Sequence, residues 1–181
     1  EVVQKILQDL YDRDEIYKAE YTGWYCVGDE RFYTEKVLVE GKCPECGRDV
    51  AAIKESNYFF RMSKYQDWLI NHIQTHADFI VPSFRANETL GFLKRELSDL
   101  CISRPKSRLS WGIELPFDKD YVCYVWFDAL INYISGVGYL NDDKLFETWW
   151  PASYHLIGKD ILTTHTVYWP TMLKAMNLPL P

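Results

Sequence analysis

The sequence predicts an α/β protein, half of an open sheet flanked by helices, joined to a small cysteine-bearing module. Two observations predict the sheet: the apolar segments YVCYVW (residues 121–126) and YHLIG (154–158) are each followed by a helical pattern. Alternation of strand and helix is typical of parallel sheets, whose ligands bind beyond the carboxyl ends of the strands. A third observation, the knuckle CPECG at residues 43–47, predicts the module.

The first 118 residues mix helical and strand patterns. Val2, Ile6 and Leu10 recur at helical spacing over residues 1–11. Aromatic and β-forming residues predict a hairpin over residues 21–38. Further along we expect, in order, a strand over 58–62, a helix over 64–76, and a helix that Asn87 caps and that ends near residue 100.

The carboxyl-terminal part carries the two strand–helix units. The first helix is expected over residues 127–139, and the second over 160–176, where Pro170 is expected to kink it. The predicted strand ends are Trp126 and Gly158, so we expect a ligand pocket beside them.

Composition and charge narrow the class of protein. A hydrophobic share of 48% predicts an ordered core, and the net charge of −6 disfavours a surface of clustered Lys and Arg that binds nucleic-acid phosphates. No apolar run approaches the roughly 18 residues of a membrane helix. The first ten residues lack the pattern of a signal peptide, so the five cysteines are expected as thiols or metal ligands in a cytoplasmic protein.

Four side chains have the spacing of a paired-knuckle zinc site. Cys26 and Asp29 show the same two-residue gap as Cys43 and Cys46, and 13 residues separate the two pairs. Zinc accepts three thiolates and one carboxylate, and four protein ligands would make the ion structural. The alternative is a hydrogen-bonded hairpin with buried thiols, in which Asp29 and Glu30 form a solvated turn.

The first strand end is followed by an aromatic stripe. Trp126, Ala129 or Leu130, and Tyr133 fall on one helical face at spacings of three and four. Such a stripe can line a pocket, but core packing is the commoner role of a bare aromatic stripe.

The second strand end is followed by polar residues. Gly158 allows close approach of a ligand, and Asp160 can accept hydrogen bonds from sugar hydroxyls or stabilise a helix N-terminus. His165 lies one turn before Trp169, as a pocket member or as a hydrogen-bonded structural histidine.

Four segments resemble the methionyl-tRNA synthetases: GWYCVGDERFYTEK, ESNYFFRMSKYQDWL, YVWFDALINYI, and YHLIGKDIL with THTVYWPTML. They follow one another in the same order as in that family and extend across almost the whole chain. The resemblance implies the second half of a class I Rossmann-like catalytic domain with a small α+β connective insertion. It implies an edge helix over 1–20, the knuckle-bearing insertion over 21–60, the rest of the connective region over 61–118, and the Rossmann half over 119–181. The sequence departs from the family pattern at Asp29, usually Cys or His, at Leu130, Pro in some members, and at Thr164, often aromatic.

The resemblance implies ATP-dependent ligation of L-methionine to tRNA(Met) through a methionyl-adenylate, with Mg-ATP as a substrate. The family signatures HIGH and KMSKS do not occur in the sequence, so we expect a piece of a longer enzyme that is inactive by itself. By resemblance, Trp126, Ala129, Tyr133, Ile161 and His165 line the methionine pocket, Gly158 and Asp160 face the ATP ribose, and Arg104 lies near the active site. The alternatives are a class I synthetase for another apolar amino acid and a non-catalytic zinc-knuckle module that binds tRNA or protein.

Overall fold

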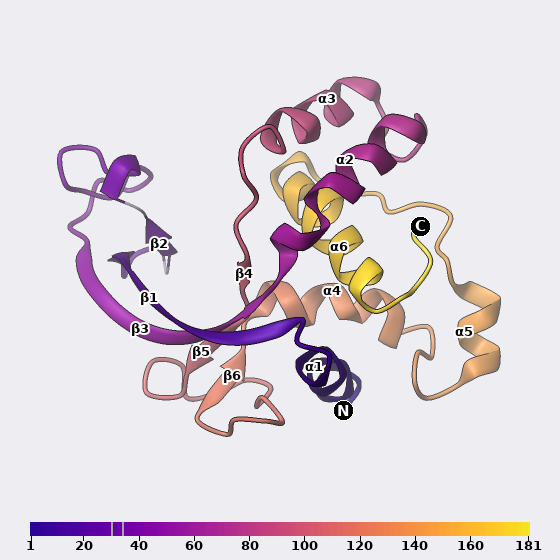
Figure 1. Ribbon diagram of the computed structural model, residues 1–181, viewed down its shortest axis with the longest axis horizontal. Helices are drawn as coiled ribbons and strands as arrows, with labels where there is room; N and C mark the ends of the chain where they lie inside the picture. Colours follow the sequence, from indigo (N-terminus) through magenta and orange to yellow (C-terminus); the bar gives the residue numbers. More distant parts are fainter. Residues whose placement is uncertain (30, 34) are drawn as a thin grey trace. The chain divides into compact units, whose positions relative to one another are not determined.

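The chain folds into two compact units. The computed structural model describes every residue except Glu30 and Thr34. Unit 1 consists of Glu1–Tyr17 together with Phe59–Pro181, and unit 2 consists of Lys18–Tyr58. Figure 1 follows both units along the sequence by colour.

Two long strands carry the chain from one unit into the other. Strands β1 (Ile16–Cys26) and β3 (Ala51–Phe60) are neighbours in a sheet of order β2-β1-β3-β4 (Figure 1). Strand β2 (Arg31–Tyr33) pairs antiparallel with β1, and Trp24 lies opposite Tyr33. The hairpin that the sequence predicts is therefore confirmed, and the 3-10 turn η1 (Glu35–Val37) follows it.

The amino-terminal helix of unit 1 is the one that the apolar spacing predicts. Helix α1 (Val2–Asp12) buries one face, formed by Val2, Ile6, Leu7 and Leu10. After the helix, Glu15 is buried, and its carboxylate forms an ion pair with Lys64. Because a buried charge is costly without a partner, this pair fixes the chain at the entry to β1.

The helix predicted over 64–76 is confirmed as the 3-10 turn η2 (Met62–Tyr65) and helix α2 (Gln66–Thr75). Helix α3 (Ser83–Phe92) is shorter than predicted and starts after Pro82, so the expectations that Asn87 caps it and that it reaches residue 100 are wrong. The Gln66 side chain explains the early end. Its amide nitrogen donates to the carbonyls of Leu93 and Arg95, both at 2.8 Å, and its oxygen accepts the Leu97 N–H at 2.9 Å. These bonds satisfy backbone groups that a longer helix would pair.

The strand predicted over 121–126 ends three residues early. Strand β4 (Leu100–Cys101) pairs with β3, and β5 (Ser103–Pro105) pairs antiparallel with β6 (Tyr121–Cys123). Helix α4 (Val125–Ser135) starts directly after Tyr124, so Trp126 lies in the first turn of a helix and not at a strand end. Apolar periodicity alone cannot separate the end of a buried strand from the first turn of a buried helix.

The second predicted strand, over 154–158, is wrong for the described part of the chain. These residues have no regular secondary structure, and Tyr154 and Leu156 are 82% and 96% exposed. A strand needs a neighbouring strand to pair its backbone groups, and none of the described strands pairs with this segment. Helix α5 (Asp143–Trp149), which precedes it, was not predicted; Asp142 caps it by accepting the Leu145 N–H.

The last helix is confirmed as one continuous helical run with a widened turn. It consists of the 3-10 turn η3 (Lys159–Ile161), the π-turn η4 (Thr164–Tyr168) and α6 (Trp169–Ala175). Pro170 gives a physical reason for the widening, because a proline ring clashes with the carbonyl four residues earlier in an ideal α-helix. No helix in the described residues is both long and apolar enough to cross a membrane.

Candidate functional site

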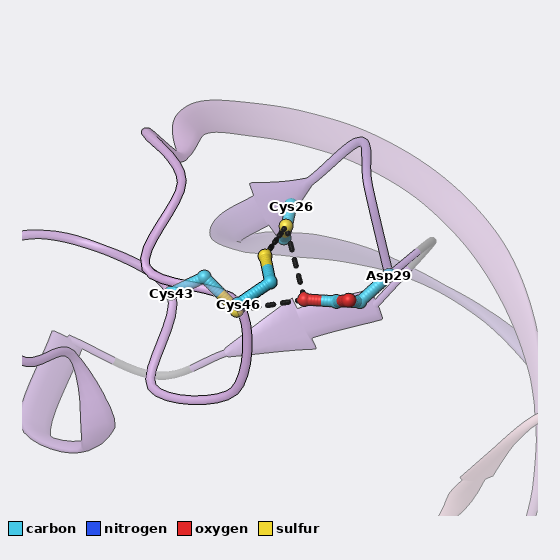
Figure 2. Close-up of side chains that lie close together, drawn as sticks. All are labelled: Cys26, Asp29, Cys43 and Cys46. Atoms are coloured by element: carbon cyan, nitrogen blue, oxygen red, sulfur yellow. Dashed lines mark hydrogen bonds between the residues drawn. The ribbon is translucent and has the colours of Figure 1, made fainter.

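The knuckle of unit 2 brings the four predicted ligands together. The sulfur atoms of Cys26, Cys43 and Cys46 and a carboxylate oxygen of Asp29 all lie within 4.8 Å of one another (Figure 2). Cys26 is the last residue of β1, and Asp29 follows in the turn toward β2. The alternative of a solvated turn at Asp29–Glu30 falls partly on Glu30, which lies outside the described residues.

A tight turn aims the other two thiols at the same point. The Gly47 N–H donates to the Cys43 carbonyl at 3.0 Å, and the Cys43 N–H donates to the Arg48 carbonyl at 2.9 Å. Gly47 has a φ of +69°, a conformation that a residue with a side chain rarely adopts, so glycine allows the reversal. Cys46 thereby returns toward Cys26, with 3.4 Å between the two sulfur atoms.

The Asp29 carboxylate is the acceptor at the centre of the knuckle. Its Oδ2 accepts hydrogen bonds from the thiols of Cys43 at 2.9 Å and Cys26 at 3.3 Å (Figure 2). Hydrogen bonds from Cys43, then Cys46 and Cys26, lower the pKa of Asp29. The interaction with Asp29 raises the pKa of Cys46 to about 12. Without a metal, a protonated Cys46 thiol therefore lies beside an ionised Asp29 carboxylate.

The donor set of the knuckle fits zinc. Zinc–sulfur bonds of about 2.3 Å in a tetrahedron place neighbouring sulfurs about 3.8 Å apart, close to the 3.4 Å between Cys26 and Cys46. Cys26 and Cys43 are buried, and Tyr33, Leu38 and Val50 pack around them. A partly buried set of three thiols and one carboxylate has the composition and size of a structural zinc site, with no ligand position left for water.

In unit 1, the structure brings Tyr133 of α4 to His165 of the π-turn. The Tyr133 hydroxyl lies 2.9 Å from Nε2 of His165, and Nδ1 of His165 lies 3.0 Å from the Ile161 carbonyl oxygen. A carbonyl can only accept, so Nδ1 carries the ring proton of the neutral imidazole. Nε2 then accepts, and the Tyr133 hydroxyl donates its proton to it.

An aromatic cluster around this pair includes a histidine that the sequence reasoning missed. The Trp169 indole N–H donates to Nε2 of His155 at 3.2 Å, and the rings of Tyr133 and His155 lie 4.3 Å apart. Burial, and then the charge of His165, lower the pKa of His155. His155 falls in the segment predicted as a strand, where the sequence gives no sign that it faces Tyr133.

No described contact joins the other predicted pocket residues to the Tyr133–His165 pair through their side chains. Trp126 is half-buried and Ala129 is exposed, two turns and one turn before Tyr133 on α4. Gly158 and Asp160 are exposed at the start of the last helical run, and a Cβ added at Gly158 would meet no described atom within 4 Å. Of these residues, Ala129, Gly158 and Asp160 lie at the surface of the described chain.

Arg104 is held inside the protein. Its guanidinium stacks on the ring of Tyr124 at 4.1 Å and donates to the Ser103 carbonyl at 2.7 Å. The side chain is buried at the β5–α4 junction, where these contacts fix it. A cavity of about 600 Å³ lies elsewhere in unit 1, with Phe92, Leu97 and Tyr168 in its lining and without Tyr133 or His165.

Comparisons with known proteins decide the family. The family model described as "tRNA synthetases class I (M)" matches residues 1–53 and 49–181. The methionine–tRNA ligase of Clostridium acetobutylicum is 56% identical over 181 residues, which are 99% of this chain and 28% of that protein. The chain belongs to the methionyl-tRNA synthetase family. The resemblance seen in the four sequence segments is thus confirmed.

Other members of the methionyl-tRNA synthetase family agree in sequence and fold. The methionine–tRNA ligase of Caldanaerobacter subterraneus subsp. tengcongensis is 52% identical over all of this chain and 28% of its own length. The Mycobacterium tuberculosis methionyl-tRNA synthetase bound by methionyl-adenylate superposes with a TM-score of 0.87 at 42% identity, over 99% of this chain and 36% of that one. The class I α/β fold is therefore confirmed. The chain spans about 28% of the length of the curated relatives.

Proposed function

We propose that this chain supplies the amino-acid-selecting part of an enzyme that ligates L-methionine to tRNA(Met) with ATP, through a methionyl-adenylate. The single observation that carries the proposal is the hydrogen-bonded pair of Tyr133 and His165, set among aromatic rings. It lies in a chain whose relatives are named methionine–tRNA ligases. The sequence departures at Leu130 and Thr164 leave both members of the pair intact.

The chemistry of methionine suits such a pair. The thioether is apolar and accepts hydrogen bonds only weakly, so shape and soft aromatic contacts must select it. Sulfur–aromatic contacts contribute about 0.3–1.5 kcal/mol each. The Tyr133 proton is already donated to His165, so the ring edges meet the thioether without an unpaired donor that would favour a polar side chain. Trp126, Ala129, Tyr133, Ile161 and His165 form the proposed methionine pocket.

ATP would bind at the start of the last helical run. Asp160 is exposed there, and its carboxylate can accept hydrogen bonds from ribose hydroxyls, while Gly158 leaves room for close approach. Arg104 remains a prediction as an active-site residue, because its present contacts are structural. Mg-ATP, L-methionine and tRNA(Met) are the substrates of the proposed reaction.

Zinc is the proposed structural ion of unit 2. Cys26, Asp29, Cys43 and Cys46 would hold it. Unit 2, Lys18–Tyr58, is close to the size of about 40 residues below which a hydrophobic core rarely suffices without a metal or disulfides. When bound, the ion would cross-link the β1–β2 hairpin to the knuckle, and this chain's residues would only hold it, because all four positions are filled.

ATP–pyrophosphate exchange by the full-length enzyme tests the proposed pocket. His165→Ala should raise the methionine KM much more than the ATP KM, because the imidazole lies on the amino-acid side. His76→Ala is the matched control, since His76 is an exposed histidine at the end of α2 and should leave both constants unchanged. Equal changes in the two KM values for His165→Ala would refute the pocket.

A further inference from the structure

The residue that carries the proposed pocket, His165, lies in a distorted turn. In η4 the Trp169 N–H reaches the Thr164 carbonyl, five residues back instead of four. Wide turns of this kind are rare inside helices and are frequent at functional sites. Something must hold this turn in one arrangement, because a helix segment with irregular bonding has more than one way to pair its backbone.

A buried pair of hydroxyls joins this turn to another helix. Oγ1 of Thr166 lies 3.0 Å from Oγ1 of Thr89 on α3. The two threonines are far apart in sequence, and both are buried: Thr89 is 3% exposed and Thr166 is 7% exposed. Because both threonines are buried, their hydroxyls depend on protein groups for hydrogen bonds.

Each hydroxyl also contacts its own helix. Thr166 Oγ1 lies 2.9 Å from the Leu162 carbonyl oxygen, and Thr89 Oγ1 lies 3.2 Å from the Arg85 carbonyl oxygen. Each hydroxyl has one proton, so when one hydroxyl donates across to the other helix, only the accepting hydroxyl can donate to the carbonyl of its own helix. The result is a buried hydroxyl–hydroxyl hydrogen bond that joins α3 to Thr166 of the π-turn.

We infer that Thr89 and Thr166 form a positioning pair that sets the direction of the His165 ring. Thr166 and His165 are adjacent in the same turn, so a contact that fixes the Thr166 side chain toward α3 also fixes the direction of the His165 side chain. That direction is toward Tyr133 on α4, 2.9 Å from Nε2. The inference deepens the proposed function and rests on it, since it names residues that act on the methionine pocket through His165 without touching the ligand.

The test uses valine and serine at position 166 in the full-length enzyme. Thr166→Val keeps the shape and removes the hydroxyl, and we expect the methionine KM to rise about tenfold while the ATP KM changes by less than about twofold. Thr166→Ser keeps the hydroxyl and should therefore keep the methionine KM of the unchanged enzyme. Thr89→Val should reproduce the effect of Thr166→Val, and the two together should be no worse than either alone, because they remove the same bond.

Thr171→Val is the matched control. Thr171 is also a buried threonine of the last helical run, but among the described residues its hydroxyl bonds only the carbonyls of Val167 and Tyr168, at 2.9 and 2.8 Å, in its own helix. It should leave the methionine KM within about twofold, although it removes one hydrogen bond as well. An equal rise in the control would overturn the inference, because any lost hydroxyl would then have the same effect.

A double-mutant cycle separates positioning from general stability. In a Tyr133→Phe background the His165 bond is absent, so Thr166→Val should add less than about threefold to the methionine KM. Full additivity would overturn the inference. The proposed function fails separately: if His165→Ala leaves the methionine KM unchanged, the pocket itself is wrong, whereas a large His165→Ala effect with none for Thr166→Val refutes only the positioning pair.

Discussion

Removal of a single oxygen atom, in Tyr133→Phe, tests the chemistry assigned to the Tyr133–His165 pair. The ring stays, with its contacts to His155 at 4.3 Å and to Trp169 at 6.0 Å, and only the 2.9 Å hydrogen bond to Nε2 of His165 is lost. The imidazole keeps its Nδ1 bond to the Ile161 carbonyl but has no donor for Nε2. The change is therefore confined to one acceptor.

The size of the expected rise in the methionine KM follows from the loss of the hydrogen-bond donor to Nε2 of His165. A hydrogen bond between neutral groups contributes about 0.5–1.5 kcal/mol net, and an unsatisfied buried acceptor costs about 1–3 kcal/mol. Both residues are half-buried, so water can reach the pair in part, and about 1.5 kcal/mol is a reasonable middle value. This corresponds to a rise of about tenfold in the methionine KM.

The assay is ATP–pyrophosphate exchange by the full-length enzyme at varied L-methionine and at varied ATP. The matched control is Tyr139→Phe, since the Tyr139 ring is also half-buried and packs against Phe146 at 5.0 Å but lies beyond the end of α4. The control should keep both KM values. An unchanged methionine KM in Tyr133→Phe, or an equal rise in the ATP KM, would refute the reasoning.

Two further predictions concern the metal and the pH. Purified protein should contain zinc near one equivalent by elemental analysis, and Asp29→Ala should lose the zinc to a colorimetric chelator at least about tenfold faster than the unchanged protein. The control Asp49→Ala removes an exposed carboxylate of the same unit and should not speed the loss of zinc. Equal retention of zinc in both variants would exclude Asp29 as a ligand. Burial, and then the charges of the nearby His76 and Lys174, lower the pKa of His72. As the pH falls, His72 therefore becomes protonated in the unfolded chain before it does so in the folded chain. Stability from this source is complete above about pH 6.5 and is lost as the pH falls, so His72→Gln should flatten the pH dependence of urea unfolding between about pH 5 and 7, and an unchanged slope would contradict the assignment.

The sequence predicted best where one local pattern decides the structure. The apolar spacing in α1 and the spacing of the Cys26–Asp29 and Cys43–Cys46 pairs each depend on a few neighbouring residues. The structure confirms the helix and brings the four side chains of the knuckle together. The extent of α3 was not predictable in this way, because Gln66, far away in sequence, pairs the backbone groups that end it. The apolar residues 154–158 predict a strand, although a strand forms only beside another strand.

The pocket could be predicted only in part. Spacing along α4 put Trp126, Ala129 and Tyr133 on one face, but the partner of Tyr133 comes from another segment and depends on a π-turn that no simple period describes. His155 and the Thr89–Thr166 bond were missed for the same reason, since each is a contact between segments distant in sequence. The division of the chain into an edge helix, insertion, connective region and Rossmann half remains a prediction.

A crystal structure of the full-length enzyme with L-methionine would be the decisive test of the proposed methionine pocket. We expect the thioether sulfur to lie about 5 Å from the Tyr133 ring, with Trp126 and His165 in the lining of the same cavity. Methionine bound at a site that includes neither Tyr133 nor His165 would contradict it.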